Sequence, residues 1–395
     1  MKTLKEKNKA SNGSFLILIP VLFFTFIFCS AVCSAAQASV ADKIAYYQSI
    51  YDREYQKSYK IYDRMAAAGD TTRTNTYYHF QYVLAPTVSM FEATGDEKYL
   101  ERALVWAETM ISKAVIIDKN GNRNWSGPWQ CPYTDKPTTY MLGDLQGSTE
   151  LARMARIILT DPKLKAKYGK RAQVIYEFVR DEIVEKYIGV RNALSWFRNT
   201  YLQQTAPMSD KTLILTRILT DLFLIDGNPR YGDLAKEFAE GFRKRLEPYK
   251  GGLIWDRGLG WKGNTSMDTS HSNRPPWTVI DLYKAGMVFS IDDIKGMANL
   301  LTKVIWNKSL TEPRFNNFID GSNGRFRNSG PWGVGQIYSG WVKLGEFDPE
   351  VQKVAEAVME AILAGKKNPS LDYHNNEKGR LSLAGHLAAN LAAAK

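Results

Sequence analysis

An internal repeat of helical hairpins is the feature that most constrains how this chain can fold. Apolar segments with helical periodicity run into short acidic or glycine-containing turns, and a second helical segment follows each turn. Aspartate and proline in these turns suit the N-cap and the first turn of the second helix. The turn aspartates recur at spacings of 65, 65, 66 and 56 residues, at Asp96, Asp161, Asp226, Asp292 and Asp348. The repeat therefore predicts five or more hairpins in series.

The remaining pattern favours an all-α fold. Alternation of β-branched and polar residues is scarce, and residues 40–67 read as a further long helix. A repeat of this length is long for an extended helical solenoid, whose units are shorter. We therefore expect about six or seven hairpins to form an incomplete or closed barrel, an α/α toroid. An open α-solenoid is the alternative.

The first 38 residues have the layout of a secretory signal peptide. A basic stretch from Lys2 to Lys9 precedes the apolar run Phe15 to Phe28, and small residues lead to Ala36-Gln37-Ala38. We expect cleavage near Ala38, which leaves one toroidal catalytic domain over residues 39–395 in the periplasm or the medium. An uncleaved anchor helix is the alternative, although the apolar run is short for a membrane span.

Charge and cysteine content narrow the choice of partner. The formal charge is +11, and loss of four lysines and Glu6 with the leader lowers it to +8. Cleavage also leaves Cys131 as the single cysteine, so no internal disulfide can form. A positive surplus favours a polyanionic partner. For an exported chain we expect an acidic polysaccharide rather than nucleic acid, with no membrane association after cleavage, no cofactor and a monomeric state.

Four long connections between hairpins are expected to share one mouth of the ring: 117–143, 189–209, 250–277 and 310–335. They hold seven of the ten tryptophans, and twelve Lys and Arg against six Asp and Glu. Aromatic rings can stack on sugar faces, and arginine binds carboxylates bidentately. Tryptophans that only pack the loops onto the ring are the alternative. The candidate substrate-binding residues are Trp125, Trp129, Tyr140, Trp196, Arg198, Trp261, Asp268, Arg325, Arg327 and Trp332.

The most specific run is Asp-Thr-Ser-His-Ser-Asn-Arg-Pro-Pro-Trp, from Asp268 to Trp277. It ends the third long connection and places a histidine and an arginine at the mouth. Of the four histidines, His271 is the one in the right place for chemistry. We expect His386 to pack in the core, His374 to lie at the surface, and His79 to face either the core or the lumen.

The hairpin series, the Trp- and Arg-rich loops and the Asp268–Trp277 run resemble polysaccharide lyases of the α/α-toroid fold, which cleave uronic-acid polymers. The resemblance is nearest to the alginate and glucuronan lyases of polysaccharide lyase family 38. It implies β-elimination, in which an Asn or Arg neutralises the uronate carboxylate, a His takes the C5 proton and a Tyr protonates the leaving oxygen. On this chain it implies His271 as base, Asn199 and Arg274 as neutralisers and Tyr338 as acid, with Tyr140 in reserve. The Asn-His dipeptide of the better-known toroidal alginate lyases is absent.

Two other functions remain open from the sequence. A glycoside hydrolase on the same toroid needs two carboxyl groups, and the loops offer Asp256, Asp268, Glu312 and Asp320. A non-catalytic glycan-binding protein would keep the tryptophans and arginines and would not need His271.

The sequence contains no convincing motif for a catalytic metal or for phosphate binding. The sequence has no His-Glu-x-x-His motif, and its few histidines are scattered, so no catalytic metal is expected. A structural calcium ion in the loop Asp118–Asn124 is an alternative that the sequence leaves open. The glycine pairs at 258–260 and 333–335 lack the Lys-Ser/Thr of a phosphate-binding loop and read as turns.

Overall fold

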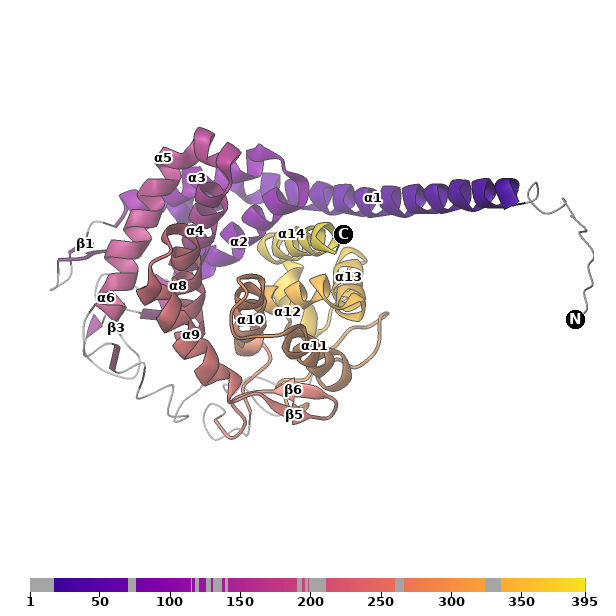
Figure 1. The fold of residues 1–395 in the computed structure, drawn as a ribbon. Coiled ribbons are helices and arrows are strands. Elements are labelled where there is room, and N and C mark those ends of the chain that lie inside the picture. Colours follow the sequence, from indigo (N-terminus) through magenta and orange to yellow (C-terminus); the bar gives the residue numbers. More distant parts are fainter. Residues whose placement is uncertain are drawn as a thin grey trace, which may run out of the picture.

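The computed structural model describes residues 18–69, 76–114, 116–117, 121–125, 129–130, 137–138, 141–189, 194–195, 198, 211–259, 266–323 and 335–394. For residues 18–39, 116–117, 124, 129–130, 137–138 and 141, only the backbone is described. Within these ranges the chain is almost entirely helical (Figure 1).

Six helices of the described chain form an inner ring. They are α2 (Thr76–Thr94), α4 (Met141–Thr160), α8 (Thr212–Asp226), α10 (Arg274–Lys284), α12 (Ser339–Lys343) and α14 (Glu377–Ala393). Each packs against the next in this order, and α14 packs against α2, so the ring is closed (Figure 1). The toroid predicted from the repeat is confirmed in its closed form, and the open solenoid is wrong.

The outer layer consists of the helices that pair with the inner ones. They are α1 (Leu18–Ala66), α3 (Glu97–Ser112), α5 (Pro162–Glu177), α9 (Pro229–Arg243), α11 (Ile291–Leu300) and α13 (Pro349–Leu363). The π-helix η1 (Phe178–Val184) and α6 (Glu185–Ile188) extend α5, and the π-helix η5 (Leu301–Ile305) extends α11. Because α14 packs on α1 as well as on α2, the first and last described helices close the ring together.

Strands play a minor part in the described chain and lie in the connections. Three two-stranded antiparallel sheets pair β1 (Ile116–Ile117) with β2 (Arg123–Asn124), β3 (Trp129–Gln130) with β4 (Pro137–Thr138), and β5 (Glu247–Tyr249) with β6 (Gly252–Ile254). Three 3₁₀-helices flank the inner helices. They are η4 (His271–Asn273) before α10, η6 (Leu344–Glu346) after α12 and the longer η7 (Pro369–Asn375) before α14.

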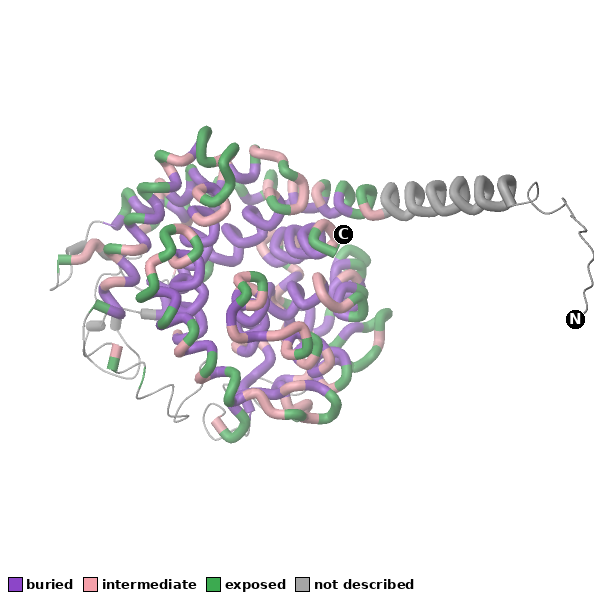
Figure 2. The backbone as a smooth tube through the Cα atoms, in the orientation of Figure 1, coloured by how far each residue is buried: buried purple, intermediate pink, exposed green. Residues whose placement is uncertain are grey.

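The inner helices are buried on nearly every side (Figure 2). Every residue from Thr212 to Leu222 of α8 is buried. An inner helix packs on two ring neighbours and on the outer layer, and its remaining side faces the side chains that fill the lumen. Two glycines permit close approaches in this ring. A Cβ on Gly385 of α14 would lie 2.6 Å from the carbonyl oxygen of Pro86, and one on Gly340 of α12 would lie 1.7 Å from that of Asn273.

The repeat aspartates are helix caps at three of the five turns. Asp96, Asp161 and Asp348 are the N-caps of α3, α5 and α13 and accept hydrogen bonds from first-turn amides. At the other two turns the cap lies two residues from the repeat aspartate, since Asn228 caps α9 and Ser290 caps α11 in a capping box with Asp293. Only the residue directly before the first helical turn has the extended backbone from which its side chain reaches those amides.

Candidate functional site

The mouth of the ring is the end at which the inner helices begin. Each turn from an inner to an outer helix is short, for example Gly95-Asp96 between α2 and α3. The connections from an outer helix back to an inner one are long, so they gather at the N-terminal ends of the inner helices. Side chains near these ends converge from four elements: Tyr78 and Tyr82 on α2, Gln146 on α4, Arg274 on α10, and Tyr338 just before α12.

Asp268 and His271 form a hydrogen-bonded pair at the entrance to α10. His271 Nδ1 lies 2.8 Å from Asp268 Oδ2 and 3.0 Å from Oδ1, and the His271 backbone amide donates to Oδ1 at 3.0 Å. The Asp268 carboxylate is also bonded by the Ser270 hydroxyl. The Thr269 amide donates to Asn317 O at 2.8 Å, which anchors this turn to the fourth long connection.

The pair is set up for proton transfer. Burial raises the pKa of Asp268, but the hydrogen bonds and charge of His271 outweigh it, so the pKa lies below its usual value and the carboxyl is ionised at neutral pH. An ionised Asp268 accepts from Nδ1 and so favours the tautomer that leaves Nε2 to accept a proton. The Asp268 side chain is 4% exposed and that of His271 is 19% exposed, so the carboxylate is covered while the imidazole reaches the mouth.

Arg274 is held between α2 and α4. Its Nε and Nη2 donate to Gln146 Oε1 at 3.0 and 2.8 Å, and Nη2 also donates to the Tyr78 hydroxyl at 2.6 Å. Gln146 Nε2 in turn donates to Tyr78 O at 3.1 Å. These contacts fix a buried guanidinium at the mouth of the lumen.

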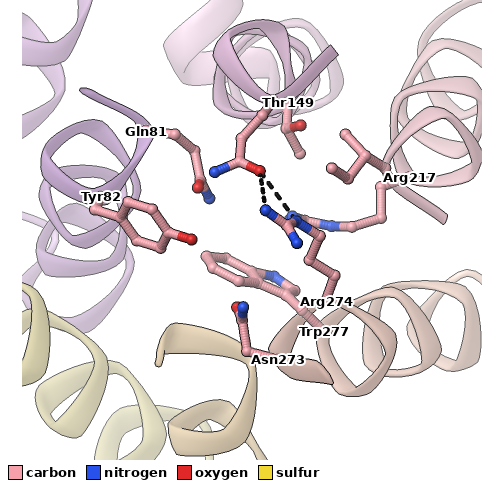
Figure 3. A pocket seen from close by; sticks show the side chains of 9 residues that line it. Gln81, Tyr82, Thr149, Arg217, Asn273, Arg274 and Trp277 are labelled. Atoms are coloured by element: carbon pink, nitrogen blue, oxygen red, sulfur yellow. Dashed lines mark hydrogen bonds between the residues drawn. The ribbon is translucent and has the colours of Figure 1, made fainter. Parts of the chain in front are cut away.

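A small cavity, with room for about one water molecule, lies next to Arg274 inside the lumen. Trp277, one helical turn further along α10, lines it together with Gln81 and Tyr82 of α2 and Thr149 of α4 (Figure 3). Its lining consists of Gln81, Tyr82, Gln146, Thr149, Ile214, Arg217, Asn273, Arg274 and Trp277.

Tyrosines form the wall of the mouth beside Arg274. The ring centroids of Tyr338 and Tyr373 are 4.2 Å apart, and those of Tyr82 lie 5.7 and 5.8 Å from them. Burial and then the neighbouring Tyr82, Tyr78 and Asp268 raise the pKa of Tyr338, and Arg274 opposes part of the rise. The Tyr338 phenol is therefore protonated at neutral pH, and it donates to Gln336 Oε1 at 2.8 Å.

Several of these residues were missed by the sequence analysis. Tyr78, Tyr82, Gln146 and Tyr373 contribute to the mouth but lie outside the four long connections. The available signal was Tyr78 and Tyr82, spaced four residues apart at the start of a helix, which places both on one face.

Trp125 and Arg198 do not lie where the sequence analysis expected. Trp125 is 1% exposed, its ring packs on Tyr77 and Phe178, and its Nε1 donates to Met110 O at 2.7 Å, so it cannot stack on a sugar. Packing explains this tryptophan. Arg198 donates to Glu237 of the outer helix α9 at 2.6 Å. Its guanidinium, which was expected to bind substrate, is therefore already paired with a carboxylate.

Other predicted residues lie outside the described part. For Trp129 only the backbone, in β3, is described. The remaining ones are Tyr140, Trp196, Asn199, Trp261, Arg325, Arg327 and Trp332. Of the histidines, His386 is buried as expected, but His374 is buried too and lies 2.7 Å from Ile337 O, which corrects its expected surface position.

Among the four loop carboxylates considered for hydrolysis, Asp268 belongs to the mouth. Asp256 is buried in an ion pair with Arg245 at 2.7 Å, and Glu312 pairs with Arg314 at the surface. Asp320 accepts from Ser266 at 3.0 Å and from Ser322 at 2.6 Å. Within the described ranges no three His, Cys, Asp or Glu side chains could together hold a metal ion, and no helix is long and apolar enough to cross a membrane.

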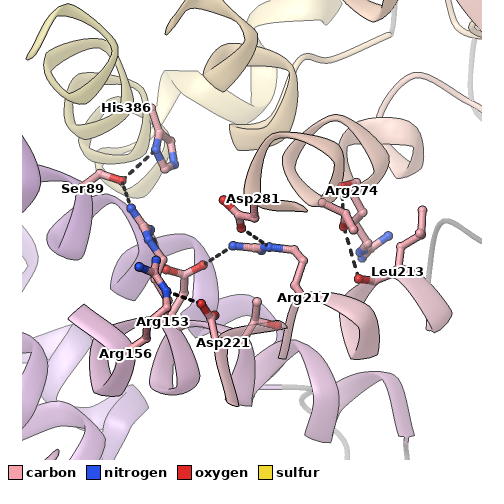
Figure 4. A network of polar contacts seen from close by, with 12 residues as sticks. Ser89, Arg153, Arg156, Leu213, Arg217, Asp221, Arg274, Asp281 and His386 are labelled. Atoms are coloured by element: carbon pink, nitrogen blue, oxygen red, sulfur yellow. Dashed lines mark hydrogen bonds and ion pairs between the residues drawn. The ribbon is translucent and has the colours of Figure 1, made fainter. Parts of the chain in front are cut away.

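Beyond the cavity, a buried ion network fills the far end of the lumen (Figure 4). Arg153 pairs with Glu150 at 2.8 Å and also with Glu92, while Arg217 pairs with Asp281 at 2.7 Å and approaches Glu150 at 3.5 Å. The network ties α2, α4, α8 and α10 together.

Lys343 lies near this network but, unlike its arginines, is not paired with a described carboxylate. Its side chain is buried against the Trp277 ring, with Nζ 5.4 Å from the ring centroid, and it makes no hydrogen bond or ion pair within the described residues. Burial, followed by the charges of Arg153 and Lys284, lowers its pKa from 10.5 to about 8. A protonated Lys343 therefore destabilises the fold at neutral pH.

Replacing Lys343 by methionine should accordingly raise the free energy of unfolding at pH 7, by about 1–3 kcal/mol. The unfolded lysine binds more protons than the folded one between pH 8 and 10.5, so wild-type stability rises across that window and the difference from the variant shrinks. Urea unfolding at pH 7 and pH 10 measures both effects. Lys353→Met is the control, because Lys353 lies on the exposed face of α13 and is not among the charges that lower the pKa of Lys343. A less stable K343M protein at pH 7 would overturn the assignment.

No family model and no curated protein matches this sequence. Solved structures do match its fold. A glycosyl hydrolase family 88 protein from Bacteroides vulgatus is 13% identical, with 88% of this chain and 98% of that chain covered and a TM-score of 0.50. The α-1,6-mannanase GH76A of Salegentibacter sp. HEL1_6 is 14% identical, with 87% and 98% covered and a TM-score of 0.45. An inactive variant of that mannanase in complex with α-1,6-mannotriose gives 0.49 over 87% and 99%.

The match at a TM-score of 0.50 agrees with the α/α toroid and corrects the lyase interpretation. That protein is described as a glycosyl hydrolase, not as a polysaccharide lyase. The expectation of an alginate or glucuronan lyase, and of β-elimination, is therefore wrong.

Proposed function

We propose that this chain is a glycoside hydrolase that cleaves an acidic glycan at the mouth of the toroid. The observation that carries the proposal is the Asp268–His271 pair, in which a buried, ionised carboxylate lies 2.8 Å from the ring nitrogen of a partly exposed histidine. The hydrolases of matching fold described above support the reaction class.

Hydrolysis needs a base that takes a proton from water and an acid that gives one to the departing oxygen, roles that most glycoside hydrolases fill with two carboxyl groups. Of the four loop carboxylates considered above, Asp268 is the one bonded to His271, so we assign the roles around this pair instead. We assign the base to His271, whose Nε2 accepts the proton while Asp268 stabilises the imidazolium that forms. Water then forms its bond to the anomeric carbon as the glycosidic C–O bond breaks. Tyr338 is the proposed proton donor because it lies at the mouth with its phenol protonated; the Arg274 charge opposes part of the rise in its pKa.

The substrate is proposed to carry acidic groups. Arg274 donates to Gln146 and to the Tyr78 hydroxyl at the mouth, in a chain with a formal charge of +11. A planar guanidinium in this position suits bidentate binding of a carboxylate. Asn199 and the predicted aromatic and basic loop residues outside the described part are kept as proposed substrate contacts. Export and a monomeric state are likewise retained as proposals.

The test is release of reducing ends from a panel of uronate-containing, sulfated and neutral glycans by the purified protein. The proposal predicts release from an acidic glycan and not from α-1,6-mannan. Release from neutral glycans alone would contradict the acidic substrate. Binding without release from any glycan would favour the non-catalytic interpretation.

A further inference from the structure

Lys378 is a half-buried cation at the mouth. It lies in the first turn of α14, and within the described part of the chain it makes no hydrogen bond and no ion pair. The adjacent Glu377 is directed instead to Arg380, at 3.6 Å. Burial lowers the pKa of Lys378, so holding its charge in this position is unfavourable without an anion.

The surroundings of Lys378 connect it to the proposed active site. Its Nζ lies 5.9 Å from the centroid of the Tyr373 ring, which packs on Tyr338. His79 lies in the first turn of the neighbouring inner helix α2, and Lys378 lies in the first turn of α14, which packs on α2, so both residues are at the same end of adjacent helices. The charge of Lys378 adds to burial in lowering the pKa of His79. The exposed His79 ring lies 5.1 Å from that of Tyr78, whose hydroxyl is bonded by Arg274.

We propose that Lys378 and His79 form an anion subsite that binds a second acidic group of the glycan, a carboxylate or a sulfate ester. The subsite lies on the α2–α14 side of the mouth, separated from Arg274 by the tyrosine wall of Tyr78, Tyr338 and Tyr373. This inference rests on the proposed function, and it adds that acidic groups on more than one sugar are recognised.

The chemistry of the pair fits such a ligand. An acidic group between the lysine and the histidine supplies the counter-charge that the described residues do not. The anion also offsets the Lys378 charge that lowers the pKa of His79, so the imidazole can donate a hydrogen bond to it. The neighbouring tyrosine rings provide apolar faces on which the sugar carrying the group can pack. A neutral sugar at this place would leave the Lys378 charge uncompensated.

Lys378→Met tests the subsite, because methionine keeps the apolar stem and removes the charge. On an acidic oligosaccharide substrate it should raise KM about 10- to 100-fold with kcat nearly unchanged, because a hydrogen bond between charged groups is lost. On the carboxyl-reduced, neutral form of the same oligosaccharide, the variant and the wild type should have the same KM. Lys378→Arg should restore binding of the acidic form.

Lys353→Met, on the exposed face of the outer helix α13, is the matched control and should behave as wild type on both substrates. Parallel series with uronate and sulfate-ester oligosaccharides identify which anion is bound. An unchanged KM of K378M on both series, or an equal rise on acidic and neutral forms, overturns the subsite. If no glycan is cleaved, the proposed function fails, and calorimetric titration of the same oligosaccharides still decides the subsite by the same comparison.

Discussion

Replacing His271 by alanine should lower kcat by about 10²–10⁴-fold and change KM far less. The imidazole is assigned to proton transfer rather than to substrate binding, so its loss raises the barrier of the chemical step. The side chain is 19% exposed and is bonded through Nδ1 to Asp268, so truncation leaves no large cavity in the core. Steady-state kinetics on the glycan that the wild type cleaves measures the effect.

His271→Gln separates chemistry from folding. Glutamine keeps a polar side chain beside Asp268 but cannot take up a proton near neutral pH, so it should be as inactive as alanine. Both variants should melt within a few degrees of the wild type. A kcat within about threefold of the wild type in either variant would remove His271 from the mechanism.

Asp268→Asn should produce a second large loss, again of about 10²–10⁴-fold in kcat. The amide is nearly the same size as the carboxylate and can still accept from the His271 and Ser270 donors. It no longer stabilises the imidazolium, and its NH2 group can select the wrong histidine tautomer. Kinetics at neutral pH measure the loss.

The same variant changes the pH dependence of stability. The folded pKa of Asp268 lies below its unfolded value, so its contribution is present above the unfolded pKa and is lost as the pH falls through the folded one. Wild type should therefore lose more stability than D268N on acidification below about pH 4. Asp320→Asn is the control, since Asp320 also accepts from two serines, Ser266 and Ser322, whereas Asp268 accepts from His271. Equal kcat losses in both variants would mean that Asp268 has a structural role only.

The fold could be predicted from the sequence because its determinants are local. Helical periodicity and the caps Asp96, Asp161 and Asp348 recur along the chain, and each acts within one turn. The site was predicted in part, because Asp268, His271 and Arg274 share one short run. Its other members depend on ring closure. Tyr78 and Gln146 meet Arg274 only because α10 faces α2 and α4 across the lumen, which no local pattern specifies.

Whether a tryptophan is buried or exposed could not be predicted from the sequence. Trp125 is a residue type that can stack on a sugar, yet its ring is buried between Tyr77 and Phe178. The sequence alone does not distinguish the two roles, because the same apolar ring can bind a sugar or pack in the core. The reaction class was also beyond the sequence. A histidine, an arginine and a tyrosine at a cationic mouth are compatible with elimination and with hydrolysis, because both reactions need a base, an acid and a group that binds acidic sugars.

The most direct test of the hydrolase proposal is to digest the preferred glycan in oxygen-18 water and weigh the products by mass spectrometry. Hydrolysis adds one water per cleavage, so the account predicts one oxygen-18 atom at each new reducing end and no conjugated double bond in the ultraviolet spectrum. Preformed oligosaccharides incubated with the enzyme in the same water correct for exchange. Products that lack the added water and absorb in the ultraviolet would contradict the account.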